Sequence, residues 1–128
     1  MSSCVEVQNA NVWHGTADSI TATTDTTLVA ATTGRRYSIV SVVFTIFGGT
    51  VAPTAGTTIK LYSGTSGGTV LLNIPTPDVV DVVVHYPFYF GLAPIWAATS
   101  AAITAKLSAA LGASGTWSLV VTGTYRNG

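Results

Sequence analysis

The chain has 128 residues, the length of one domain, and only 8% of them are charged, with five basic and five acidic side chains that cancel. This balance excludes an extended phosphate-binding surface, so we expect no nucleic-acid partner. The single cysteine, Cys4, excludes an internal disulfide and a cysteine-based zinc site.

Apolar residues are nevertheless abundant, at 48% of the chain. The densest run, Val79–Phe90, is interrupted by Asp81, His85 and Pro87, so no membrane-spanning helix is expected. The start of the chain lacks a basic residue followed by an apolar run, so no signal peptide is expected. We therefore expect a protein–protein interface to cover the surplus apolar surface. The alternative is a sheet surface made polar without charge by the 21 threonines.

Residues 1–25 show no sustained periodicity and are rich in small polar residues. We expect an extended N-terminal arm here, with Trp13 as an apolar anchor that reaches a neighbouring subunit. The alternative is a frayed terminus. A single β-sandwich domain is then expected over residues 26–128.

The first strands of this domain are expected at 26–31 and 36–47. Apolar residues occupy both parities of the 36–47 segment, which predicts a central strand covered on both faces. A loop is expected at 48–56. The alternating segments 57–63 and 70–74, joined by the glycine-rich turn 64–68, predict a β-hairpin.

The second half of the chain predicts further strands at 79–85, 95–97 and 103–108. An aromatic loop or strand end is expected at 86–91. The clearest alternation is in the last strand, where Trp117, Leu119 and Val121 share one face and Gly123 suggests a bulge. A helix across 97–111 is the alternative to a strand and loop, because this segment is rich in alanine, but it has no capping acid.

Seven or eight short strands separated by turns predict an all-β sandwich or barrel, and we expect a two-sheet antiparallel β-sandwich, jelly-roll-like in its connections. An immunoglobulin-like strand order is the alternative that the sequence leaves open.

No catalytic constellation is visible, so we expect no enzymatic activity, no cofactor and no metal site. Asp78 and Asp81 could form a pair of glycosidase carboxylates, and Asp81 and His85 share a strand parity, but no Gly-x-Ser-x-Gly motif supplies a nucleophile. The two histidines, His14 and His85, are too far apart in sequence to predict a metal site.

Carbohydrate binding remains a candidate, because β-sandwiches bind sugars on exposed aromatic rings. Trp117 has core parity and Trp96 is expected to be buried, which leaves Tyr62 as the one plausible exposed platform.

The interface is expected in the aromatic segment after residue 79 and at the arm. With Val80, Val82 and Val84 in the core, the outward set would include part of the following aromatic run. The candidate interface residues are Trp13, Val83, Tyr86, Phe88, Tyr89 and Phe90.

The order of these segments resembles the small β-sandwich virion proteins of tailed bacteriophages, in particular head decoration (cement) proteins. The resemblance covers the last hundred residues or so. It lies in the order and spacing of the segments Leu28-Val-Ala-Ala, Gly34-Arg-Arg, Ile39-Val-Ser-Val-Val, Ile59-Lys-Leu-Tyr-Ser-Gly and Val120-Val-Thr-Gly-Thr-Tyr125.

The resemblance implies a non-enzymatic structural protein, made in the host cytoplasm and located on the virion. It would bind the major capsid protein on the outside of the phage head as a homotrimer and stabilise capsomer contacts. A tail-fibre, spike or carbohydrate-binding module for receptor recognition is the alternative.

Overall fold

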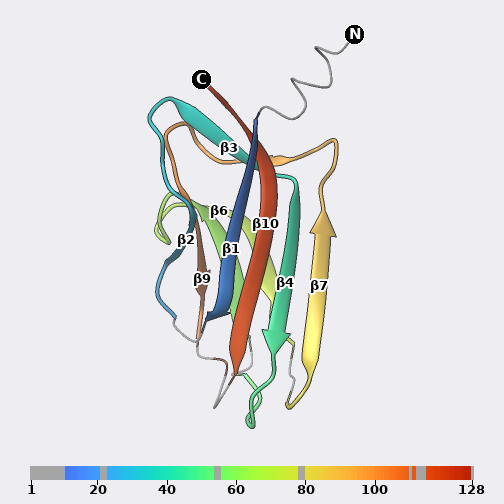
Figure 1. Cartoon of the computed structure of the whole chain (residues 1–128). Coiled ribbons are helices and arrows are strands. Elements are labelled where there is room, and N and C mark those ends of the chain that lie inside the picture. The colour runs from blue at the N-terminus through green and yellow to red at the C-terminus, as the bar shows by residue number, and fades with distance from the viewer. Residues whose placement is uncertain are drawn as a thin grey trace.

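The computed structural model describes residues 11–20, 23–53, 56–77, 80–109, 111 and 115–127. These residues form ten strands in two antiparallel sheets and contain no helix (Figure 1). The predicted all-β, two-sheet sandwich is therefore confirmed. The strand number is higher than expected, because residues 12–20 form a strand and the long central strand is divided in two.

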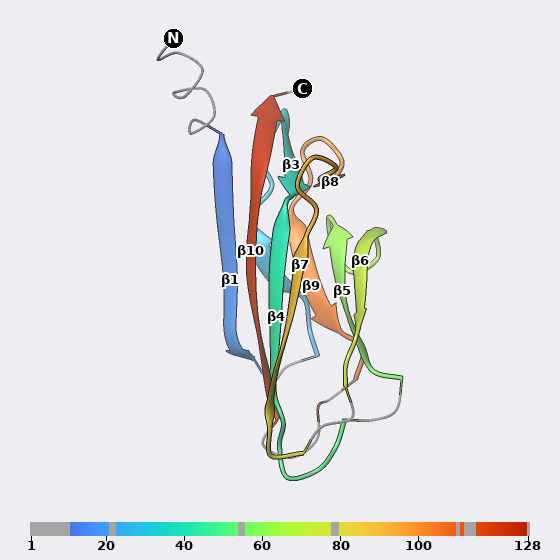
Figure 2. The ribbon, with the colours of Figure 1, turned by 90° about the vertical axis from the view of Figure 1, so that its right-hand side faces the viewer.

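The larger sheet has six strands in the order β7 (Val83–Tyr89), β4 (Ser41–Phe47), β10 (Thr116–Asn127), β3 (Arg35–Ile39) and β8 (Ile95–Trp96), with β1 (Val12–Ile20) paired to β10. The smaller sheet has four strands in the order β2 (Thr26–Val29), β9 (Ile103–Leu107), β5 (Thr58–Ser63) and β6 (Thr69–Pro75). Figure 2 shows the two layers from the side, and most connections cross from one layer to the other.

Alternation along β10 builds the core. Trp117, Leu119 and Val121 are fully buried between the sheets, as their spacing predicted. Across the core, the smaller sheet contributes Ile59, Leu61, Ile74, Ile103 and Leu107, none of which is more than 1% exposed. Burial of this branched and aromatic set is the main force that holds the layers together.

The expected strand 36–47 is interrupted at Val40, between β3 and β4, and both parts pair with β10. From Thr122 to Tyr125, β10 advances three residues while its partner goes back four, from Ser41 to Tyr37. The extra residue is a β-bulge, which explains why one sequence run gives two strands.

The expectation that this segment is covered on both faces is correct for β3 and wrong for β4. Tyr37, Ser38 and Ile39 in β3 are all buried, whereas Val43 and Phe47 in β4 are exposed. β8 pairs with the edge of β3, and β4 has Val43 and Phe47 exposed on its outer side.

The bulge lies opposite Gly123, where the absence of a side chain is required. A Cβ atom there would lie 1.7 Å from the Ser38 carbonyl oxygen and 2.5 Å from Nε1 of Trp13. The Trp13 indole crosses β10 over this glycine, and its Nε1 donates a buried hydrogen bond of 2.6 Å to the Ser38 carbonyl. The glycine thus lets β1 and β3 interact across the strand between them.

This contact corrects the expected arm. Residues 12–20 form β1, which pairs with β10 from Val12 opposite Thr124 to Ile20 opposite Trp117. Trp13 and Ala17 are buried in the same core as β10. The sandwich therefore includes this strand and does not begin at residue 26. Residues 1–10 lie outside the described part of the chain.

Two further expectations concern the hairpin and the segment 97–111. The hairpin is confirmed, with β5 and β6 paired from Thr58 opposite Pro75 to Ser63 opposite Thr69. The strand expected at 103–108 is confirmed as β9 (Ile103–Leu107), which pairs with β5 and β2, so the alternative of a helix across 97–111 is wrong. Alanine propensity is overridden there because Ile103, Ala105 and Leu107 alternate into the core.

Candidate docking surface

The outer side of the six-stranded sheet carries the largest group of exposed apolar side chains on paired strands. On β4 the outward positions are Ser41, Val43, Thr45 and Phe47, because Val42, Phe44 and Ile46 fill the core. Their pairing partners on β7 and β10 point the same way, since paired residues in an antiparallel ladder share a face.

Two cross-strand rows make this surface apolar. In one row, Val43 lies between Pro87 of β7 and Val120 of β10. In the next apolar row, Phe47 lies between Val83 and Thr116. We refer to Val43, Phe47, Val83, Pro87 and Val120 as the outer apolar face. Val43 and Phe47 are 37% and 38% exposed, and Val83 is 51% exposed.

Polar side chains in the adjoining rows pair with one another. Between the two apolar rows, Thr45 Oγ1 lies 2.9 Å from Nδ1 of His85 on β7, and in the row on the other side of Val43, Ser41 shares a hydrogen bond with Thr122 on β10. At the β1 side, the Ser118 hydroxyl donates to Asp18 at 3.1 Å. No Asp, Glu, Lys or Arg lies within β4, within β7 or between residues 116 and 124 of β10. A partner covering this surface would therefore bury few charges or unmatched hydroxyls.

The free edge of β7 is poorly suited to pairing with another strand. Phe90 donates to the Val40 carbonyl and Gly48 donates to the Val82 carbonyl, so even-numbered residues of this strand face β4. Pro87 consequently points its backbone to the free edge, where it offers no N–H. Pro87 therefore hinders the addition of another strand at the β7 edge.

The six candidate interface residues fall into two groups. Val83 and Tyr89 lie on the outer side of β7, and Tyr89 is 80% exposed. Tyr86, Phe88 and Phe90 have the opposite parity and pack, partly buried, against the core, and Trp13 is a core residue. The expected outward placement is therefore wrong at these four positions, whereas contact of any of the six residues with a partner stays a prediction.

These residues were placed on the wrong side because the sequence analysis assigned the inward positions before β7 incorrectly. Val80 and Val82 were expected in the core, but both are exposed, in the turn before β7. That turn includes Asp81 in the left-handed region, with φ of 54°. The strand begins at Val83, so its inward residues are Val84, Tyr86 and Phe88. Val79 lies outside the described residues.

Sequence reasoning missed Val43, Phe47, Pro87 and Val120. For Val120 a signal was present: it is an apolar residue on the parity of Ser118, Thr122 and Thr124 in the clearest alternating strand. Val43 and Phe47 could not be found this way, because both parities of their strand are apolar.

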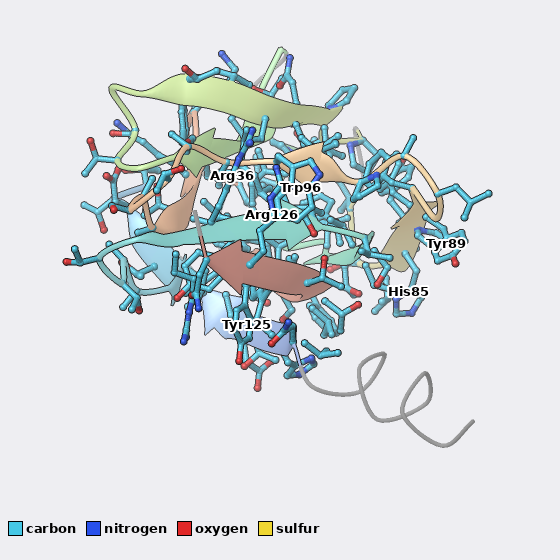
Figure 3. All side chains as sticks on the ribbon, turned by 90° about the horizontal axis from the view of Figure 1, so that it is seen from above. Arg36, His85, Tyr89, Trp96, Tyr125 and Arg126 are labelled. Carbon is cyan, nitrogen blue, oxygen red and sulfur yellow. The ribbon has the colours of Figure 1, made fainter. Side chains whose placement is uncertain are left out.

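A separate polar group lies at the end of the sandwich where β3, β8 and β10 meet. The guanidinium carbon of Arg126 lies 4.5 Å from the centroid of the Trp96 ring, and that of Arg36 lies 5.5 Å from it. Figure 3 shows these three side chains gathered together, with Tyr125 on the opposite side of β10 and with His85 and Tyr89 at a distance. Arg35 lies over Tyr125, at 4.1 Å.

The titratable residues do not converge. Asp81 lies in the turn before β7, and His85 contacts Thr45, so the shared strand parity expected for this pair does not exist. Asp78 is outside the described part of the chain. Asp25 accepts a hydrogen bond from the Ser66 backbone N–H, and bonds from the side chain and backbone of Ser66 lower the pKa of this carboxyl. Among the described residues, no three His, Cys, Asp or Glu side chains lie close enough to hold a metal ion.

The tryptophans offer no open platform for a sugar ring. Trp13 and Trp117 are buried, and two guanidinium groups lie over Trp96. Tyr62, the expected platform, is half-buried on β5. Within the described part of the chain, none of these four rings is both fully exposed and next to a second aromatic ring.

No membrane-spanning helix is found among the residues that the structure describes. Comparison of the sequence with protein-family models and with curated proteins gives no match. What this surface binds is therefore inferred from its own geometry and chemistry.

Proposed function

We propose that this chain is a non-catalytic structural protein that docks on another protein through the outer apolar face. The observation that carries the proposal is the apolar row that Val43 forms with Pro87 and Val120 across three strands, with Phe47 and Val83 in a second apolar row beyond the polar row of Thr45 and His85. Exposed apolar surface grouped in this way on a small protein is characteristic of interaction sites. Tyr89 lies beside it as an exposed aromatic anchor.

The biological setting that we propose is the outside of a phage head, where the protein acts as a decoration (cement) subunit. The partner on the outer apolar face is then the major capsid protein. The two-sheet sandwich supports this setting, as does the resemblance to phage head decoration proteins in the order and spacing of the strands. The proposal includes a homo-oligomer, expected as a trimer. Light scattering of the purified protein at micromolar concentration checks this part, and a monodisperse monomer of 13.1 kDa would contradict it.

The test is a matched pair of substitutions on the two sheets. Val120→Glu places a charge at the β10 end of the central row of the outer apolar face, and Val70→Glu places one on β6 of the other sheet. The two valines are similarly exposed, at 42% and 45%. Phage particles depleted of this protein are mixed with each variant and sedimented, and the bound fraction is measured.

We expect Val120→Glu to bind about tenfold more weakly, a loss of about 1.4 kcal/mol, because a carboxylate must be desolvated at the contact. Val70→Glu should bind as the unmodified chain does. Circular dichroism and thermal unfolding establish that both variants fold. Unchanged binding of Val120→Glu, or an equal loss in both variants, would contradict docking through this face.

A further inference from the structure

Three of the chain's five basic side chains gather at one end of the molecule. Arg35 and Arg36 begin β3, Arg126 is near the end of β10, and the ladder places Arg36 directly opposite Arg126. Like charges directly opposite one another destabilise a sheet. No described carboxylate forms an ion pair with any of the three arginines.

Aromatic rings hold these guanidinium groups in place. Arg36 and Arg126 both lie over the Trp96 ring, which is half-buried. Arg36 is fixed further, because its Nε donates a hydrogen bond of 2.7 Å to the Ala97 carbonyl. The cation–π contacts partly offset the repulsion between the two charges.

The remaining donors are available for a ligand. Among the described residues, none accepts a hydrogen bond from the Nη groups of Arg36 or from Arg126. A guanidinium that lies over a ring keeps its N–H edges free for bonds in its own plane. Because both side chains are already ordered, an anion that binds them meets a smaller loss of conformational entropy.

We propose that Arg36, Arg126 and Trp96 form a docking site for an acidic side chain, aspartate or glutamate, of a protein partner. The planar fork of arginine matches a carboxylate with two parallel hydrogen bonds. A nucleic acid is disfavoured, because the two lysines, Lys60 and Lys106, lie on the smaller sheet and do not extend the cluster into a track. The inference rests on the proposed function only in taking the partner to be a protein.

The experiment titrates the full chain at low salt with an acetylated hexaglutamate peptide. Binding is followed by the NMR shift of the Trp96 indole N–H, which is assigned with a Trp96→Phe variant. Arg126→Gln is compared with Lys60→Gln, which changes the net charge equally on the other sheet. Inorganic phosphate and a thymidine oligonucleotide of matched charge are titrated in parallel.

We expect the peptide to shift the Trp96 signal and Arg126→Gln to weaken binding about fivefold, the upper range for an exposed ion pair. Lys60→Gln should bind as the unmodified chain does. Absence of peptide binding, or an equal loss in Lys60→Gln, would overturn the site. Tighter binding of phosphate or of the oligonucleotide would overturn its assignment to carboxylates. Either failure leaves the Val120→Glu result on particles intact, so the two proposals can fail separately.

Discussion

At the scale of single residues, the tightest constraint is the crossing of Trp13 over Gly123. Gly123→Ala should destabilise the fold by about 3 kcal/mol or more, because the new methyl group would meet the Ser38 carbonyl and displace the indole. Gly67→Ala is the matched control, since a Cβ atom there meets no atom within 4 Å. Thermal unfolding of the two variants measures the difference. Equal stability would mean that the bulge relaxes around the added methyl group.

The same residues explain why Trp13 could not be placed from the sequence. A tryptophan in a segment without periodicity looks like an isolated anchor. Its role depends on a glycine 110 positions later in the chain and on a carbonyl in a third strand. Only the strand order brings these groups together.

At the scale of elements, β1 is part of the sandwich. Deletion of residues 2–20 should therefore strongly destabilise or unfold the protein, because it exposes the edge of β10 and removes Trp13 and Ala17 from the core. Deletion of residues 2–10 is the control, as it keeps β1 complete. Chemical denaturation followed by circular dichroism measures both. A folded 2–20 deletion with unchanged stability would restore the interpretation of this segment as an independent arm.

The sequence predicted elements well where one parity was apolar and the other polar. The clean alternation of β10 and of β5 identified their faces, whereas on β6 a bulge moves Val70 to the outer side, away from Leu72 and Ile74. The inward face could not be predicted where both alternating sets of a strand are apolar, as in Ser41–Phe47. It was predicted wrongly where a turn changes which residues point inward, as at Asp81 before β7. In those segments only the partner strands decide which side faces the core. Of the four outward residues of β7, the predicted interface included two, Val83 and Tyr89, although the strand was expected to start earlier.

At the scale of the whole molecule, the two sheets present different surfaces. The outer side of β4 and β7 has no charged side chain. On the smaller sheet, Lys60 and Lys106 lie opposite one another on β5 and β9, each flanked along its strand by buried apolar residues, so both point outward. If the larger sheet faces the partner, the lysine-bearing side of the sandwich must face solvent.

This orientation can be measured by chemical labelling of the protein on particles. Tyr89, which is 80% exposed in the free chain, should be protected from nitration when the protein is bound, because it lies beside the outer apolar face. Lys60 and Lys106 should be acylated at similar rates in the free and bound protein, and quantitative peptide mass spectrometry reports all three sites. Half-buried Tyr62 on β5 is the internal control for nitration and should not change. Protection of the lysines with continued labelling of Tyr89 would reverse the orientation and move the docking surface to the smaller sheet. Protection of all three would mean that neighbouring copies cover both layers, which would contradict a surface subunit with one face open to solvent.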